Sequence, residues 1–435
     1  MTFKNSRILQ RKGHSLIPGG CHTYSKGDDQ FPETAPAYIQ RGKGCHVWDV
    51  DGNEYIEYGM GLRAVTLGHA YAPVVEAAQR QMLLGSNFTR PSVIEVEVAE
   101  LMVSLIEGAE MVKFAKNGSD VTTAAVKLAR ACTGRDMVAI CENHPFFSVD
   151  DWFIGSTVMN AGIPMAIQDL TVKFNYNDIG SLESLFEKHA GKIACVILEP
   201  VTFEEPERNY LQEAKELCGR NGAIFILDEM ITGFRLHIGG GQKYYGVIPD
   251  LSTFGKAMGN GFSVSALVGK REFMDRGGLH HDKERVFLLS TTHGAETHAL
   301  AAAKETISIY QREPVIETLR MQGDRLKTGI DKAAAENRVT EYFQVVGKPG
   351  NLVYVTRDES GDRSQAHRTL VLQELIKRGV LAPSLVVSYS HADADIDRTI
   401  EVFHETLRIY RKALDEGIGK YLEGRAVKPV YRKYN

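Results

Sequence analysis

The sequence predicts an α/β protein: a large domain with a mostly parallel sheet flanked by helices, joined to a smaller α+β domain. Short apolar runs alternate with amphipathic helical patterns through the middle of the chain, which is typical of a parallel sheet covered on both faces. Near the start, Asp51-Gly52 separates two alternating segments and indicates a β-hairpin. After about residue 320 the pattern changes to helices and short strands. We therefore expect a large domain at 71–315, and a small domain formed by 316–435 with the N-terminal segment 1–70.

The individual elements follow from periodicity and from residues that favour helix ends. Residues 1 to about 70 are expected to be extended, with the hairpin at 47–58. Pro73 suits the first turn of a helix, where a missing N–H costs nothing. The expected helices are 74–84, 93–106, 120–131, 211–220, 295–310, 365–378 and a last one from 394, and the expected strands are 111–115, 137–141, 193–198, 224–227 and short ones near 351–356.

Composition excludes several classes of protein. The 435 residues are 43% hydrophobic and 24% charged, with a formal net charge of −4, as in ordinary globular proteins. There is no long basic block that would indicate nucleic-acid binding, no apolar run of membrane-spanning length, and no secretory signal in the first fifteen residues. The six cysteines and fourteen histidines lack ligand spacing. We expect a reduced, cytoplasmic protein with no metal site and no membrane or nucleic-acid partner.

Two apolar segments end in reactive side chains. One runs from Ala223 into Asp228, and the other runs from Leu251 into Lys256. If both are buried strands, they deliver a carboxylate and an amine to the carboxyl edge of a sheet, where open α/β sheets bind ligands. A pyridoxal phosphate site requires this pair, because the lysine forms a Schiff base with the aldehyde and the aspartate keeps the ring nitrogen protonated. Apolar runs ending in Asp are also common in α/β proteins, so ordinary strand ends remain an alternative.

Three other segments could complete such a site. The turn 116–120, with Gly118 and Ser119, lies between a strand and a helix and could bind a phosphate; alternatively it is an ordinary helix cap. Four aromatic rings within 144–153 follow a strand and could stack on a planar ring, although aromatic residues more often belong to a core. The polar stretch 290–296 could cap the next helix or offer hydroxyls to a phosphate.

One motif suggests a different cofactor. Residues 59–64 fit a G-x-G-x-x-A dinucleotide fingerprint. They follow an antiparallel hairpin, and the residues after them do not begin a clear helix, so the structural context of that fingerprint is missing. A dinucleotide-dependent oxidoreductase is therefore a remote alternative, which a failure to bind NAD would dismiss.

Together these segments resemble the class III pyridoxal phosphate aminotransferases, which have fold type I, in the branch that contains glutamate-1-semialdehyde 2,1-aminomutase. The resemblance runs nearly end to end, and several motifs in the right order are more specific than any one of them. The matching motifs are Ile17-Pro18-Gly19-Gly20, Trp48-Asp49-Val50-Asp51-Gly52-Asn53, Leu198-Glu199-Pro200, Asp228 to Arg235, Gly255-Lys256, Ser290 to Glu296 and Leu381-Ala382-Pro383-Ser384.

The resemblance implies a role for each matching residue. Lys256 corresponds to the Schiff-base lysine and Asp228 to the partner of the pyridine nitrogen. Gly118 and Ser119 fall where the family binds the cofactor phosphate. Thr292 falls where a family threonine reaches the phosphate of the neighbouring subunit, which implies a homodimer with shared active sites. The roles of Glu199, Glu229 and Arg235 cannot be assigned from the sequence.

Three positions depart from the family pattern. The family commonly has Tyr-His-Gly where this chain has Phe146-Phe147-Ser148; Phe146 can still stack on the cofactor ring but lacks a hydroxyl. The aminomutases carry an acidic Phe-Glu-Ala-Gly stretch after Ala-Pro-Ser, whereas here Ser384 is followed by Leu385-Val386-Val387. An arginine that holds the substrate carboxylate is replaced by Lys26, which cannot bind it in the same bidentate way.

The sequence therefore predicts a pyridoxal phosphate-dependent transaminase. It would move an amino group from a donor such as L-glutamate to a small carbonyl metabolite, such as a sugar, through the Lys256 Schiff base. Glutamate-1-semialdehyde 2,1-aminomutase, which transfers the amino group within one molecule, is the first alternative. A non-catalytic protein that binds pyridoxal phosphate is an alternative of another class.

Overall fold

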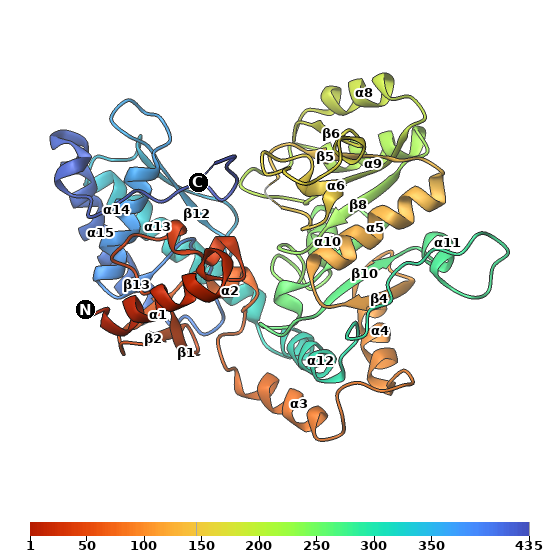
Figure 1. Cartoon of the computed structure of the whole chain (residues 1–435), viewed down its shortest axis with the longest axis horizontal. Coiled ribbons are helices and arrows are strands. Elements are labelled where there is room, and N and C mark those ends of the chain that lie inside the picture. Colours follow the sequence, from red (N-terminus) through yellow and green to blue (C-terminus); the bar gives the residue numbers. More distant parts are fainter. Residues whose placement is uncertain (145, 435) are drawn as a thin grey trace. The chain divides into compact units, whose positions relative to one another are not determined.

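The computed structural model describes residues 1–144 and 146–434 and divides into two compact units (Figure 1). We call Met1–Tyr71 with Glu317–Arg432 the terminal unit, and Ala72–Ile316 with the last residues from Lys433 the central unit. Within the described ranges, every helix is too short or too polar to cross a lipid bilayer.

The central unit is built on a seven-stranded sheet (Figure 1). Its strands, in the order in which they pair, are β4 (Met111–Ala115), β10 (Ser265–Gly269), β9 (Leu251–Phe254), β8 (Ile224–Asp228), β7 (Ile193–Leu198), β5 (Met137–Cys141) and β6 (Thr171–Phe174). The five strands from β9 to β6 are parallel, and β10 is antiparallel to both of its neighbours. The expectation of a mostly parallel sheet is confirmed.

Helices cover both faces of this sheet. The helices are α3 (Ala72–Met82), α4 (Val93–Leu105), α5 (Gly118–Thr133), α6 (Asp151–Ile154), α7 (Met165–Gln168), α8 (Ile179–Lys188), α9 (Tyr210–Arg220), α10 (Gly240–Tyr245), α11 (Arg271–Met274) and α12 (Thr297–Arg312). Leu182 of α8 and Leu217 of α9 pack with Val196 and Phe225 of the sheet, while α5 contacts β4 and β7 to β10. All six residues of β7 are buried, as expected for a central parallel strand.

The terminal unit joins both ends of the chain in one four-stranded sheet. Its strands pair in the order β1 (Ile39–Lys43), β2 (His46–Asp49), β3 (Glu54–Glu57) and β13 (Val380–Leu381), and β11 (Phe343–Val346) pairs with β12 (Val353–Thr356). The helices are α1 (Lys4–Leu16), α2 (Met60–Arg63), α13 (Val315–Glu336), α14 (Gln365–Lys377) and α15 (Asp393–Glu416). The expected hairpin is present, since β2 and β3 are antiparallel and Gly52 between them has φ 87°.

The N-terminal segment differs from the sequence-based expectation. Residues Lys4–Leu16 form helix α1 where an extended chain was expected. The preceding Phe3 provides no side-chain cap. Instead, the carboxylate of Asp51 accepts the backbone N–H groups of Asn5 (2.7 Å) and Ser6 (2.8 Å). The cap thus comes from a distant hairpin, so the local sequence lacks the usual signal for a helix start.

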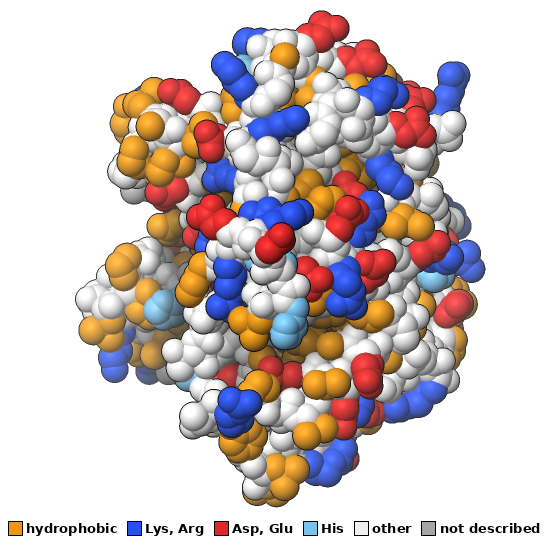
Figure 2. All heavy atoms as spheres, turned by 90° about the vertical axis from the view of Figure 1, so that its right-hand side faces the viewer, with side chains coloured by type: hydrophobic (Ala, Val, Ile, Leu, Met, Phe, Trp, Pro, Cys, Tyr) orange, Lys and Arg blue, Asp and Glu red, His pale blue; other side chains and the backbone are white. Residues whose placement is uncertain are grey.

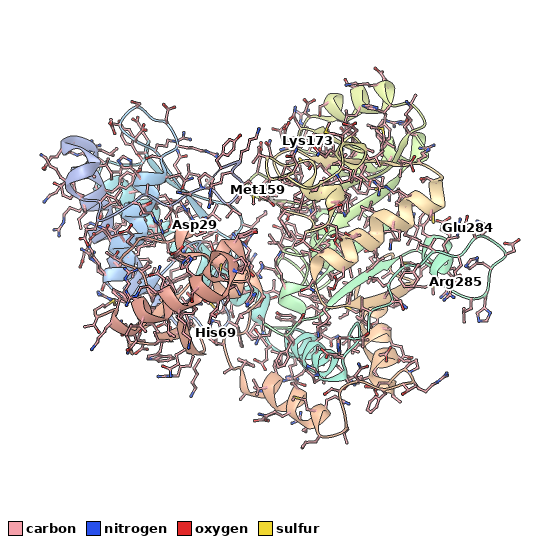
Figure 3. All side chains as sticks on the ribbon, viewed as in Figure 1. Asp29, His69, Met159, Lys173, Glu284 and Arg285 are labelled. Atoms are coloured by element: carbon pink, nitrogen blue, oxygen red, sulfur yellow. The ribbon has the colours of Figure 1, made fainter. Side chains whose placement is uncertain are left out.

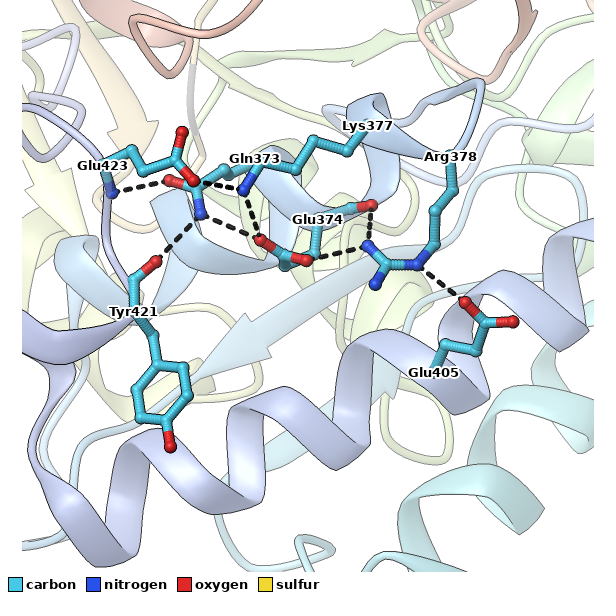
Figure 4. A network of polar contacts seen from close by, with 7 residues as sticks. All are labelled: Gln373, Glu374, Lys377, Arg378, Glu405, Tyr421 and Glu423. Atoms are coloured by element: carbon cyan, nitrogen blue, oxygen red, sulfur yellow. Dashed lines mark hydrogen bonds and ion pairs between the residues drawn. The ribbon is translucent and has the colours of Figure 1, made fainter.

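A network of polar side chains fixes the C-terminal segment to α14 (Figure 4). Glu374 is 6% exposed, and its carboxylate accepts from Lys377 (3.0 Å) and Arg378 (2.7 Å). Gln373 donates to the carbonyl of Tyr421 (3.0 Å) and accepts the N–H of Glu423 (2.8 Å). These partners satisfy groups that would be costly to bury alone.

Glu374→Gln is therefore expected to lower the free energy of unfolding by about 1–3 kcal/mol, because it removes a buried charge from two cationic partners. Urea denaturation of the purified variant measures this loss. Glu405→Gln is the matched control, since Glu405 binds the same Arg378 (2.8 Å) but is half exposed, and its loss should stay below about 1 kcal/mol. Equal losses in the two variants would contradict the importance of the buried position.

Another buried carboxylate ties β8 to α10 in the central unit. Glu229 is 0% exposed and accepts the N–H groups of Gly241 (2.7 Å) and Gln242 (2.6 Å) as well as the hydroxyl of Thr232. Burial raises the pKa of Glu229 to about 7, although the three donors act in the opposite direction. Glu229 therefore has a structural explanation that the sequence did not supply.

The raised pKa predicts a pH-dependent stability. Between pH 4.5, the ordinary value, and about 7, the folded chain keeps a proton on Glu229 that the unfolded chain releases. This contribution to the free energy of unfolding is complete below pH 4.5 and is lost as pH rises through 7. The total loss is about 3 kcal/mol. In Glu229→Gln, unfolding free energies measured from pH 5 to 8 should fall less steeply than in the wild type. The control is Glu97→Gln, at a half-exposed carboxylate, and its pH profile should match that of the wild type. Parallel profiles for Glu229→Gln and wild type would disprove the assignment of this pH dependence to Glu229.

Candidate active site

Two adjacent parallel strands bring Asp228 and Lys256 to the same edge of the sheet. Asp228 is the last residue of β8 and is in register with Thr253 of β9. The N–H of Glu229 donates to the Thr253 carbonyl (2.9 Å), which extends this pairing past the end of β8. Lys256 follows the end of β9 after Gly255. The carboxylate and the amine thus leave neighbouring strand ends, where ligands bind in open α/β sheets.

The carboxylate of Asp228 is almost fully buried. It is 1% exposed, and its Oδ1 accepts the N–H of Met230 (3.0 Å) and the hydroxyl of Thr253 (2.9 Å). Burial raises the pKa of Asp228, and the charge of Lys256 acts to lower it. Since both hydrogen bonds end on Oδ1, the other oxygen is the one that would accept a bond from a ring nitrogen.

The backbone around Lys256 is held in an uncommon conformation. Lys256 has φ 38°, a left-handed value that costs a non-glycine residue about 1–2 kcal/mol. Ala257 is anchored by the Tyr310 hydroxyl, which donates to its carbonyl (2.7 Å). A Cβ at Gly255 would lie 2.7 Å from the sulfur of Met230, so a larger residue there would displace the Met230 side chain. Strain of this kind occurs at functional sites when the surrounding contacts hold it in place.

Gly118 and Ser119 begin helix α5 at this edge. Asp120 in its first turn accepts the N–H groups of Asn117 (2.8 Å) and Lys116 (3.2 Å), and Ser265 of β10 donates to the Asn117 carbonyl (2.8 Å). α5 is 16 residues long, so its N-terminal backbone donors and dipole favour an anion. The turn is therefore both an ordinary cap and a suitable place for a phosphate.

Met230 joins the two glycine turns and was not identified from the sequence. A Cβ at Gly118 would lie 3.0 Å from its sulfur, and a Cβ at Gly255 would lie 2.7 Å from it. Met230 is 6% exposed, and its N–H binds Asp228. No sequence signal marks this methionine, because the two glycines that its sulfur packs against are more than twenty positions away, one in each direction.

The expected stacking segment is only partly described, because Pro145 lies outside the described residues. Phe146 is 44% exposed and lies edge-on to Phe153 with ring centroids 5.6 Å apart. Phe147 is 2% exposed, and its carbonyl accepts the hydroxyl of Thr122 in α5 (2.8 Å). The structure thus places Phe146 at the carboxyl end of β5 with an accessible ring, and assigns Phe147 to the core.

His144 is a further buried group at this edge. Its Nδ1 accepts the N–H of Glu199 (3.0 Å), and burial lowers its pKa to about 3, so the ring is neutral. Nε2 then carries the proton, and among the described residues it has no hydrogen-bond partner. An unsatisfied buried donor costs about 1–3 kcal/mol, which a ligand or a water molecule would recover.

Thr292 lies on an exposed loop before α12. Its carbonyl accepts from the amide of Asn87 (3.0 Å), and no hydrogen bond within the described parts of this chain joins its side chain to Asp228 or Lys256. Glu296, at the end of the same loop, forms an ion pair with Lys116 in the turn 116–120, which could bind a phosphate. The loop is thus fastened close to that turn.

The residues present fit pyridoxal phosphate. The ring nitrogen needs a buried carboxylate, the aldehyde needs an amine and the phosphate needs backbone donors. Asp228, Lys256 and the Gly118 turn supply these three groups from one edge of one sheet.

Comparison with known proteins gives the same family from several directions. A family model described as aminotransferase class III matches residues 27–407. Glutamate-1-semialdehyde 2,1-aminomutase of Acetivibrio thermocellus is 34% identical over 427 residues, which cover 92% of this chain and 97% of that protein. The 3-aminobutyryl-CoA aminotransferase of Cloacimonas acidaminovorans is 31% identical, with 95% and 99% covered.

A solved structure extends the likeness to the fold. The PLP internal aldimine form of the FumI protein from Sphingopyxis sp. MTA144 has a TM-score of 0.86 and 27% identity, covering 94% of this chain and 97% of that one. The resemblance to the branch containing the aminomutases is confirmed by the relatives. The chain belongs to the class III aminotransferases, has their α/β fold of type I, and uses pyridoxal phosphate as its cofactor.

Proposed function

We propose that this enzyme is a transaminase that moves an amino group from a donor such as L-glutamate to a small carbonyl metabolite. The observation that carries the proposal is the register of β8 and β9, which places a buried Asp228 beside the strand end that bears Lys256. An intact pair of this kind argues against a non-catalytic protein that only binds the cofactor.

The two residues of the pair have different tasks in this proposal. When bound, pyridoxal phosphate supplies an electron sink for reaction at the carbon that bears the amino group. Asp228 accepts a hydrogen bond from the ring nitrogen and keeps it protonated, and the opposite charge in turn favours the ionised carboxylate. Lys256 holds the cofactor through its amine and, once released, its Nζ takes the proton from the substrate carbon. Gly118 and Ser119 hold the phosphate at the start of α5.

The acceptor is proposed to differ from glutamate semialdehyde. Leu385, Val386 and Val387 occupy the positions after Ala-Pro-Ser where the aminomutases have an acidic stretch, and all three are 0% exposed. They form core rather than a polar recognition surface. Lys26, in place of an arginine, lies exposed in a short turn. A sugar or a similar carbonyl metabolite is the proposed acceptor.

Glutamate-1-semialdehyde aminomutase is the second candidate, and the names of several relatives at 31–34% identity favour it. The two reactions use the same cofactor residues. They differ in whether the deaminated donor leaves as a keto acid, so product analysis separates them.

We also propose a homodimer with shared active sites. The central unit exposes large apolar side chains near the end of α3 and on α4, including Leu83 (88%), Leu84 (72%) and Val93 (73%). Phe287 is 72% exposed on the loop after α11, which also carries the labelled Glu284 and Arg285 (Figure 3). Figure 2 shows hydrophobic side chains in several places among mixed charges on one face. Apolar surface of this kind is typical of an interface, and the Phe287 loop continues to Thr292.

Lys256→Ala is expected to abolish amino transfer, with at least a 1000-fold loss, because both the anchor and the proton carrier are removed. Lys113→Ala, an exposed lysine on β4, is the control and should keep wild-type activity. The first measurement is the visible absorption spectrum of the purified protein before and after L-glutamate. We expect the yellow band of the lysine-bound cofactor to bleach in the wild type and to be absent in Lys256→Ala.

The other outcomes decide between the alternatives. Turnover by Lys256→Ala at the wild-type rate would end the proposed mechanism. A yellow band that no amino donor bleaches would favour the alternative of a non-catalytic protein that binds pyridoxal phosphate. Formation of 5-aminolevulinate from glutamate-1-semialdehyde, without an added donor and without a keto acid, would establish the aminomutase.

A mixing experiment tests the shared site. Thr292→Ala should be weakly active because it removes a phosphate contact supplied to the neighbouring subunit. When Lys256→Ala and Thr292→Ala chains are unfolded together and refolded, each mixed dimer should contain one intact site. Activity should rise to about one quarter of wild type with random pairing, measured as initial rates on equal total protein.

The matched control is an equal mixture of the two variants refolded separately, in which no mixed dimer forms. Equal activity of the co-refolded mixture and this control would mean that Thr292 serves its own subunit or none. A monomer in analytical ultracentrifugation would contradict the dimer directly.

A further inference from the structure

A second cluster of polar groups lies in the terminal unit, where Cys45 and His46 at the start of β2 meet Asp395 in the first turn of α15. The thiol of Cys45 is 3.4 Å from Asp395 Oδ2, and His46 Nε2 is 3.1 Å from Asp395 Oδ1. One donor atom from each residue lies within 4.8 Å of the other two. Sulfur, imidazole nitrogen and carboxylate oxygen are the ligand types that zinc prefers.

The spacing of these atoms agrees with a zinc centre. Bonds of about 2.3 Å to sulfur and about 2.0 Å to nitrogen or oxygen, in tetrahedral geometry, place the donor atoms about 3.3–3.5 Å apart. Cys45 Sγ lies 3.4 Å from Asp395 Oδ2 and His46 Nε2 lies 3.1 Å from Asp395 Oδ1, so the two distances end on different oxygens of the carboxylate and both lie close to this spacing. We propose that Cys45, His46 and Asp395 bind one zinc ion, with a water molecule as the fourth ligand.

The other ring nitrogen of His46 has the environment expected of a zinc ligand. Nδ1 lies 2.9 Å from Glu54 Oε1, so carboxylates flank both ring nitrogens. A neutral imidazole has only one N–H and can satisfy only one of them. The contact of Nδ1 with Glu54 is an ion pair by distance and not an aligned hydrogen bond. With the proton on Nδ1, the lone pair of Nε2 points to Asp395, and a cation between them removes the repulsion. A carboxylate on the second nitrogen is the usual support of a zinc-bound histidine.

Binding requires a proton to leave Cys45. The residue is 2% exposed, and burial, with the nearby Asp395 carboxylate, raises the pKa of its thiol well above the ordinary value. On coordination the S–H bond breaks, its proton passes to water, and a sulfur–zinc bond forms with the electron pair that remains. The side chains of His46 and Asp395 are 31% and 17% exposed, which gives the ion and the proton access to solvent.

The neighbouring His391 does not complete the ligand set. Its Nδ1 accepts the N–H of Ser388 (2.9 Å), so the lone pair of that nitrogen is occupied and Nε2 carries the proton. Asp395 also accepts the N–H of Ala392 (3.0 Å) and caps α15. Zinc would therefore fasten the start of α15 to the start of β2.

This cluster was not recognised from the sequence, and no metal site was predicted. His46 and Asp395 are 349 positions apart, and the adjacent pair Cys45-His46 has no ligand spacing of its own. Only the packing of α15 on the sheet of the terminal unit brings the third ligand to the pair.

The test uses the full chain loaded with pyridoxal phosphate and freed of metal with a chelator. After incubation with Zn²⁺ and gel filtration, we expect about one zinc ion per chain and a raised thermal midpoint. Co²⁺ should give a thiolate-to-metal absorption band that Cys45→Ser abolishes and Cys132→Ser, at a free cysteine of the central unit, preserves. His46→Gln should also lose the ion, while His404→Gln, at an exposed histidine of α15, should keep it. Glu54→Gln should weaken zinc binding 10–100-fold.

Several results would overturn the proposal. These are no stoichiometric zinc in the wild type, equal zinc in Cys45→Ser and wild type, or a Co²⁺ spectrum without a thiolate band. Circular dichroism identifies a variant that fails to fold, and the His46→Gln and His404→Gln pair then decides. Amino transfer is assayed separately, so failure of the zinc site and failure of the proposed transaminase are distinguishable.

Discussion

The register between β8 and β9 is the constraint on which the candidate active site depends. Asp228 lies opposite Thr253, and this neighbour both donates its hydroxyl to the carboxylate and accepts the N–H of Glu229. A slip of one residue would turn Asp228 to the opposite face of the sheet. It would also move the strand end that bears Lys256. Because β8 is paired on both sides and wholly buried, such a slip would disrupt the core, so the core itself fixes the distance between the acid and the amine.

Close packing at this edge explains why small residues surround the reactive ones. The sulfur of Met230 fills the space that a Cβ would need at Gly118 and at Gly255. The Met230 side chain therefore holds both the turn 116–120 and the turn that bears Lys256 against the strand end that carries Asp228. The left-handed backbone of Lys256 persists under the same packing, since relaxation would displace Ala257 from its bond with Tyr310. The backbone strain at Lys256 is a consequence of close packing that permits only this arrangement.

Local signals and long-range contacts account for what the sequence could and could not predict. Strands β4, β5 and β7 were expected at the residues where they occur, because buried runs of this length have few other interpretations. Helix α1 was missed, since Asp51 caps it from a hairpin 45 positions away. Met230 was missed for the same kind of reason. The roles of Phe146 and Thr292 stay predictions, because one depends on a bound ring and the other on a second subunit.

The choice between transamination and intramolecular transfer cannot lie in the acid–amine pair. Relatives named for each reaction are 31–34% identical to this chain over nearly its whole length. In the proposed mechanism Asp228 and Lys256 act on the cofactor and the proton, and both reactions need these steps. What differs is whether the deaminated molecule stays to receive the amino group again. Retention depends on contacts with the rest of the substrate. Reaction type is thus a property of substrate-binding side chains, and the same sheet edge can serve either reaction.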